Sequence, residues 1–96
     1  MTLKRTVVFD SWLAALRDRQ ARLRIAIRLS RLQEGNPGDA KSVGSGIMEL
    51  RIRYGPGYRI YYTQRGTTLI LLLCGEDKSS QSDDIRRARE LAVTSN

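Results

Sequence analysis

Alternating apolar and polar residues in the second half of the chain constrain its fold more than any other feature. They predict three β-strands, at Ile47–Arg53, Tyr58–Gln64 and Thr67–Cys74. Gly55-Pro56-Gly57 is a turn sequence between the first two strands. The third strand is apolar on both faces, as expected of a strand that is covered on both sides. These segments together predict an antiparallel sheet.

Helical periodicity dominates the segment before the predicted sheet, after a short extended stretch at Leu3–Val8. The first predicted helix can be capped by Asp10 or Ser11 and has the apolar stripe Phe9, Trp12, Leu13 and Leu16. The second runs from Arg19 to Glu34 behind the capping residue Asp18. Its core stripe is Ala21, Ile25, Leu29 and Leu32. The short connection between the helices predicts a helical hairpin.

The rest of the chain completes an α+β pattern. Residues 36–46 form a polar loop with room for a short edge strand near Lys41–Val43. A last helix begins in the Ser79–Asp84 cluster and places Ile85, Ala88 and Ala92 on one face. We therefore expect one domain, residues 1–96, in which an N-terminal helical hairpin packs on a small antiparallel sheet with a C-terminal helix.

Composition narrows the classes of function. Lys and Arg number 17 against 10 Asp and Glu, a net charge of +7 that favours polyanionic partners. The chain has no His, which excludes Ser-His and Cys-His catalytic pairs, and its one cysteine, Cys74, lies in an apolar strand as a buried thiol would. We expect no cofactor or metal. No segment reaches the roughly 18 apolar residues of a membrane span, so we expect a cytoplasmic protein.

Strand pairing converts the alternation into a candidate site. Pairing Tyr54 with Tyr58 sets Arg53 opposite Arg59, Arg51 opposite Tyr61 and Glu49 opposite Thr63. A turn at Arg65-Gly66 then brings Cys74 opposite Gly57, so that Lys78 emerges beside the Gly-Pro-Gly turn. Opposed cations destabilise a sheet. Either a bound anion relieves them, or Glu49, Glu76 or Asp77 compensates.

The same residues resemble a known family. The runs Glu49–Ile52, Gly55–Tyr61, Gly75–Gln81 and Asp84-Ile85 are similar to HigB-type addiction-module killer proteins of the RelE/ParE toxin superfamily. The resemblance covers nearly the whole chain. Glu76 departs from it, since a second glycine is expected there. The resemblance implies a toxin neutralised by an adjacent helix-turn-helix antitoxin, through which alone it would contact operator DNA.

For such a toxin we expect metal-independent cleavage of mRNA on the ribosome. This chemistry needs a base on the ribose 2′-OH and cations on the scissile phosphate. We assign Lys78 as the base, because neighbouring arginines disfavour its charged form. The other candidates are Arg51 and Arg59 as phosphate clamps, Tyr61 as a stacking platform or proton donor, Glu49 as a competing base or an orienter of Arg51, and Arg53, Lys41 and Gln81 as RNA-binding residues.

Two other functions fit the superfamily: a non-enzymatic inhibitor of DNA gyrase, and a degenerate toxin-fold binding module. Leu23 and Ile27 add an apolar edge to the second helix, and we expect the antitoxin to bury part of the helical hairpin or the adjacent sheet face. Arg24, Arg28 and Arg31 form another face of that helix, which is better explained as a solvated face than as a nucleic-acid contact.

Overall fold

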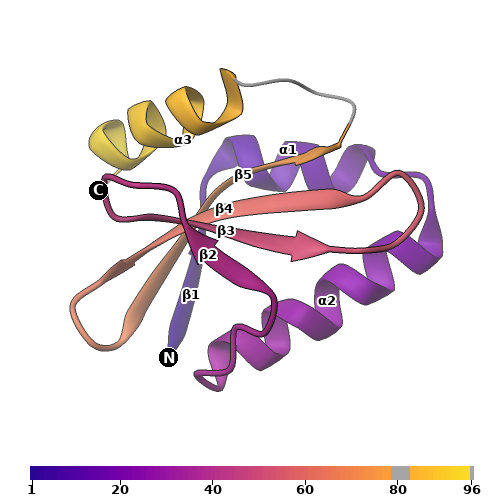
Figure 1. Cartoon of the computed structure of the whole chain (residues 1–96), viewed down its shortest axis with the longest axis horizontal. Coiled ribbons are helices and arrows are strands. Elements are labelled where there is room, and N and C mark those ends of the chain that lie inside the picture. Colours follow the sequence, from indigo (N-terminus) through magenta and orange to yellow (C-terminus); the bar gives the residue numbers. More distant parts are fainter. Residues whose placement is uncertain (79–82, 96) are drawn as a thin grey trace.

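The structure, a computed structural model, describes residues 1–78 and 83–95. The elements in chain order are β1 (Thr2–Arg5), α1 (Val7–Ala15), α2 (Arg19–Gln33), β2 (Ala40–Ser42), β3 (Ile47–Ile52), β4 (Tyr58–Arg65), β5 (Leu69–Asp77) and α3 (Asp83–Thr94). The strands form one five-stranded sheet in the order β1-β5-β4-β3-β2 (Figure 1). The α+β class is therefore confirmed.

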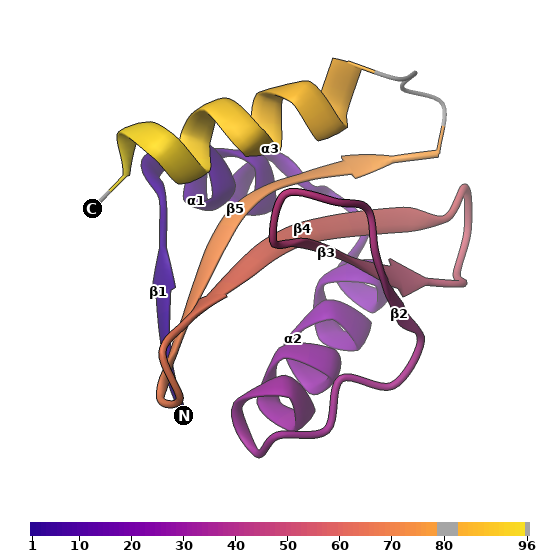
Figure 2. The same cartoon turned by 60° about the vertical axis from the view of Figure 1, so that its left-hand side comes forward.

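Helices cover both faces of the sheet (Figure 2). On one face, α1 and α2 pack against inward side chains of β3, β4 and β5, including Leu50, Ile60 and Leu72. On the other face, α3 packs over a second apolar cluster that contains Tyr61, Leu73, Cys74 and Ala88. The apolar stripes predicted for the three helices all lie in these two clusters. The second cluster matters for the site because it buries part of the sheet face that carries the predicted catalytic residues.

The N-terminal segment differs from the sequence prediction in pairing and in extent. β1 pairs with β5 in parallel, so the sheet is mixed rather than antiparallel. Parallel pairing requires a long connection between the two strands, and α1, α2 and three strands separate β1 from β5 in the chain. The extended stretch ends at Arg5, because Thr6 already caps α1 with its hydroxyl, which accepts from the Phe9 N–H at 3.0 Å. The expected caps Asp10 and Ser11 are therefore wrong, whereas Asp18 caps α2 as predicted.

The β3–β4 hairpin has a different register from the expected one. Arg51 pairs with Arg59, Glu49 with Tyr61 and Ile47 with Thr63, a shift of two residues on β3. The turn occupies residues 53–57 and is closed by the Gly57 N–H, which donates to the Tyr54 carbonyl at 2.9 Å. An even shift leaves every side chain on its predicted face. It replaces the predicted Arg53–Arg59 opposition with an opposition of Arg51 and Arg59.

The β4–β5 pairing also differs from the prediction. Arg65 pairs with Leu69 and Tyr62 with Leu72, so the turn is longer than Arg65-Gly66 alone. The pairing then shifts by one residue, because Tyr61 lies opposite Cys74 and Leu73 has no partner on β4: a β-bulge. The strand continues past the predicted end to Asp77, with Glu76 opposite Arg59. Glu76 is consequently a strand residue and not part of a loop.

Three further expectations are confirmed. A short edge strand, β2, pairs with β3. β5 is covered on both faces, by α1 and by α3. Cys74 is buried at 2 % exposure, and burial raises the pKa of its thiol to about 11. Within residues 1–78 and 83–95, no helix has the length and apolar character that crossing a bilayer requires.

Candidate functional site

A cationic pocket of about 550 Å³ lies at the end of the β3–β4 hairpin. Its lining consists of Arg51, Ile52, Arg53, Tyr54, Gly55, Pro56, Gly57, Tyr58, Arg59 and Lys78. The lining holds four cations and no carboxylate. Pairing of the strands therefore gathers four of the predicted site residues, Arg51, Arg53, Arg59 and Lys78, around one space.

Lys78 reaches this pocket through the end of β5. Its N–H donates to the Gly57 carbonyl at 2.8 Å, so the prediction that Lys78 lies beside the Gly-Pro-Gly turn is confirmed despite the different register. Gly57 has a φ of +84°, and a Cβ there would lie 3.4 Å from Lys78 Cδ. A residue without a Cβ thus allows both the turn and the close passage of the lysine side chain.

The two opposed arginines, Arg51 and Arg59, each lie near a buried carboxyl. Arg51 Nε donates to Glu49 Oε1 at 2.8 Å, and this hydrogen bond raises the pKa of Arg51. Arg59 Nη1 lies 3.8 Å from Glu76 Oε1. Glu49, one of the counter-charges expected from the sequence, therefore offsets the repulsion between the two arginines from within the protein. Repulsion alone no longer argues for a bound anion.

Arg53 is held differently, at the exposed edge of the pocket. Its Nε donates to Asp39 Oδ2 at 2.9 Å, and this contact lowers the pKa of Asp39. Both side chains are exposed, 79 % for Arg53 and 40 % for Asp39, so water and salt screen the pair. An anion can therefore displace Asp39 more readily than it can displace a buried carboxyl.

Tyr61 is buried, with 1 % of its surface exposed, and cannot stack on a base in this conformation. Its hydroxyl oxygen lies 3.2 Å from Glu49 Oε2 and 2.9 Å from Glu76 Oε1. Burial, with Glu49 as a further cause, raises the pKa of Tyr61 to about 12, so the phenol keeps its proton at neutral pH. The sequence prediction of an accessible aromatic side chain is wrong, because α3 covers this part of the sheet.

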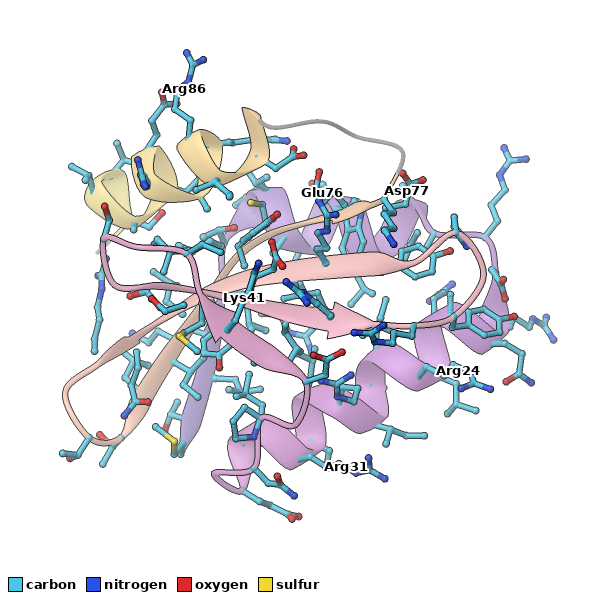
Figure 3. All side chains as sticks on the ribbon, in the orientation of Figure 1. Arg24, Arg31, Lys41, Glu76, Asp77 and Arg86 are labelled. Atoms are coloured by element: carbon cyan, nitrogen blue, oxygen red, sulfur yellow. The ribbon has the colours of Figure 1, made fainter. Side chains whose placement is uncertain are left out.

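Two other predicted residues, Lys41 and Glu49, do not line the pocket. Lys41 is exposed on β2 opposite Glu49 (Figure 3). Glu49 itself is 5 % exposed and contacts Arg51 and Tyr61, so it orients these groups and does not face a ligand. Gln81 lies outside the described residues.

A second groove, of about 370 Å³, shares Arg51, Ile52 and Arg53 with the cationic pocket. Its other lining residues are Arg24, Ile27, Arg28, Arg31 and Asp39. The Arg28 guanidinium is bonded to backbone carbonyl groups: its Nη2 donates to the Pro37 carbonyl at 3.1 Å and its Nη1 to the Arg51 carbonyl at 2.5 Å. Arg24 and Arg31 project from α2 as exposed cations, as Figure 3 shows.

Sequence reasoning missed the structural roles of Glu76, Asp39 and Asp84. The sequence indicated Glu76 as a possible counter-charge and as a departure from the family pattern, but not as a strand residue; an extension of the third predicted strand to Asp77 would have revealed its face. No local sequence pattern predicts the ion pair between Asp39 and Arg53, because it depends on how β2 pairs with β3. Burial raises the pKa of Asp84, whose Oδ2 is buried without a hydrogen-bond partner among the described residues. Across that part of the chain, no three His, Cys, Asp or Glu side chains are grouped as metal ligands.

The arrangement suits recognition of a phosphate group. Guanidinium groups give directional, two-pronged hydrogen bonds to phosphate, and a nearby ammonium adds a point charge or, when neutral, a base. The buried carboxyls of Glu49 and Glu76 lie beside Arg51 and Arg59 on the same sheet face. The orientation of the two guanidinium groups is therefore set before a ligand binds.

Comparison with known proteins gives a relative of undescribed activity. No protein-family model matches the chain. A protein of Haemophilus influenzae named only as uncharacterized is 51% identical over 90 residues, which cover 94% of this chain and 91% of that protein. Identity at that level over almost the full length of both chains shows common ancestry and a common fold. The chain therefore belongs to the same family as this uncharacterized Haemophilus influenzae protein.

Proposed function

We propose that the protein is the toxin of a type II toxin-antitoxin module, a ribosome-dependent mRNA endonuclease that acts in the cytoplasm. The observation that carries this proposal is the pocket whose four charged lining residues are all cations. The resemblance to HigB-type killer proteins in the RelE/ParE superfamily supplies the reaction and the partners: mRNA on the ribosome and a helix-turn-helix antitoxin. The net charge of +7 supports a polyanionic substrate.

The structure suggests how the roles divide. Arg51 and Arg59 bind the scissile phosphate and stabilise charge that develops in the transition state. Lys78, exposed at the pocket edge, removes the proton from the ribose 2′-OH. Arg53 guides the adjacent backbone. Glu49 and Tyr61 are buried, so they position the arginines and do not contact the RNA.

The experiment is cleavage of ribosome-bound mRNA by the purified protein and by Ala variants of Arg51, Arg59 and Lys78. Loss of either arginine is expected to raise the barrier by about 2–4 kcal/mol, as removal of a transition-state donor does in other enzymes. Lys78→Ala should abolish cleavage without lowering the melting temperature. Arg22→Ala is the matched control, since Arg22 is an exposed α2 cation that lines neither the pocket nor the groove.

Each outcome has a stated meaning. Cleavage by the wild type that all three variants retain would leave the function standing and remove the site. Intact mRNA together with inhibition of gyrase supercoiling would replace the nuclease with a gyrase inhibitor. If neither activity is detected, but an acidic partner or RNA still binds, the protein is a toxin-fold binding module.

The partner has its own test. Leu23 and Ile27 are 53% and 42% exposed on α2, which is unusual for large apolar side chains on one helix. We expect a co-expressed antitoxin to bury this edge and to slow amide exchange in α2. Unchanged exchange throughout α2 and the adjacent β2–β3 edge would place the antitoxin elsewhere.

A further inference from the structure

Two buried carboxyl groups meet at a single phenol hydroxyl. Glu49 and Glu76 are each 5% exposed, and the Tyr61 oxygen lies 3.2 Å from the first and 2.9 Å from the second. A phenol has one hydrogen to donate. Tyr61 can therefore donate to only one carboxylate, and the second contact is a hydrogen bond only if that carboxyl supplies the hydrogen. Both contacts are full hydrogen bonds if one of the two glutamates carries a proton.

The surroundings of the two carboxyls differ, and they indicate which one holds the proton. Glu49 Oε1 accepts a hydrogen bond from the Arg51 guanidinium at 2.8 Å. The cation nearest to Glu76 is Arg59, at the longer distance of 3.8 Å, and Glu76 Oε2 is buried without a hydrogen-bond partner among the described residues. A charged oxygen in that position would be desolvated and uncompensated, whereas a neutral acid carries a much smaller penalty.

We propose that Glu76 is a protonated positioning residue, and that its neutral form leaves the charge of Arg59 available to an anion in the pocket. In this state Glu76 donates its hydrogen to Tyr61, and Tyr61 donates its own hydrogen to Glu49. When Glu76 loses the proton to solvent, its carboxylate attracts Arg59 and competes with the anion. The inference rests on the proposed function only in naming that anion as a phosphate group of RNA.

Linkage fixes the sign of the pH effect. An anion that binds better when Glu76 is neutral must raise the affinity of Glu76 for its proton by the same factor. Anion affinity is therefore high below the titration of Glu76 and falls as pH rises through it.

Other ionisable groups also lie around this sheet face and can contribute to the pH dependence. Those described are Lys41 on β2, Glu49 and Arg51 on β3, Arg59 and Tyr61 on β4, Asp77 and Lys78 at the end of β5, and Asp84 and Arg87 on α3.

The first test reads the proton directly in the ligand-free protein. Carboxyl carbons of ¹³C-labelled glutamate shift when they titrate, and Glu76→Gln identifies the Glu76 signal by its disappearance. We expect the Glu76 carbon to show the protonated form at neutral pH. A Glu76 carbon that is already ionised at neutral pH overturns the proposal. If Glu76→Gln fails to fold, Glu49→Gln assigns the pair by removing the other signal.

The second test measures the linkage with inorganic sulfate, an anion whose own charge is constant across this pH range. Wild-type sulfate affinity should fall roughly fivefold or more as pH rises through the Glu76 titration, the lower end of typical coupling between sites. Glu76→Gln, a permanently neutral isostere, should retain high affinity at every pH. Glu90→Gln removes an exposed acid of α3 and should behave as wild type. The same pH dependence in Glu76→Gln as in wild type overturns the coupling.

The two tests separate this inference from the proposed function. Failure to cleave mRNA contradicts the nuclease and leaves both measurements unaffected. If neither the wild type nor the variants bind sulfate, the anion pocket is contradicted, and so is the linkage. The ligand-free spectra still decide whether Glu76 carries a proton.

Discussion

Burial decides which ionisable side chains can act on a ligand and which can act only through a neighbour. Arg51 and Arg59 are about one-third exposed, whereas the carboxyls behind them are almost fully enclosed. A ligand in the pocket can thus reach the guanidinium groups but not Glu49, Glu76 or Tyr61. The sheet pattern predicted which side chains share a face, but it could not predict this depth, because depth depends on where α3 lies.

Tyr61→Phe should lower the free energy of unfolding by about 1–3 kcal/mol, because it leaves buried carboxyl oxygens without a hydrogen-bond partner. The measurement is urea unfolding of the variant and wild type at neutral pH. Tyr62→Phe is the matched control: its ring is similarly buried on β4, and its hydroxyl makes no hydrogen bond with a described residue. Equal stability of both variants would show that the Tyr61 hydroxyl has no structural role.

Cys74 should resist thiol reagents in the folded protein. Burial raises the pKa of the thiol to about 11, so little of the reactive thiolate is present at pH 8, and only 2 % of the residue is accessible. We expect labelling by a disulfide reagent to follow global unfolding as denaturant is added. Rapid labelling in native buffer would mean that β5 opens locally on the α3 side.

At the scale of elements, the sequence predicted the faces of β3 and β4 correctly, but it predicted the strand registers and the facing of Leu71 on β5 incorrectly. In the β3–β4 hairpin, the alternation of apolar and polar residues determines which face each side chain takes. It does not determine the register, because two registers that differ by two residues, with turns of different length, satisfy the same pattern. The bulge at Leu73 could not be read from alternation, because this strand is apolar on both faces. The parallel pairing of β1 was missed because nothing within four residues of sequence specifies a distant partner.

The contact of α1 with β5 depends on Gly75. A methyl group added there would overlap the indole ring of Trp12, so Gly75→Ala should destabilise the protein by about 1–3 kcal/mol. Thermal or urea unfolding measures this change. In a Trp12→Ala background the added methyl has room, and the same substitution should cost far less. Identical costs in both backgrounds would show that the strain does not involve Trp12.

At the scale of the whole molecule, the excess of cations should appear as a salt dependence of binding. Each phosphate neutralised on a single strand contributes about 0.7 to the slope of log affinity against log salt concentration. For a non-cleavable single-stranded RNA we expect Arg53→Ala and Lys78→Ala each to reduce the slope by about that amount. Arg22→Ala, outside both concave surfaces, should leave the slope unchanged. An affinity indifferent to salt in the wild type would contradict electrostatic RNA binding.

The unpaired position of Leu73 marks a point where β5 could shorten by one residue without exchanging its faces. The change would remove a buried leucine and the carbonyl that accepts a hydrogen bond from Thr6. Removing one residue from the interior of a regular strand ordinarily exchanges the two faces of everything that follows. Here the register with β1 ends at Leu72, and the pairing with β4 resumes at Cys74. A chain that lacks Leu73 could close the gap with Cys74 still opposite Tyr61 and Glu76 still opposite Arg59. A deletion at the bulge would therefore keep Glu76 opposite Arg59 and the carboxyl pair in register, with the loss of one buried side chain as its cost in stability.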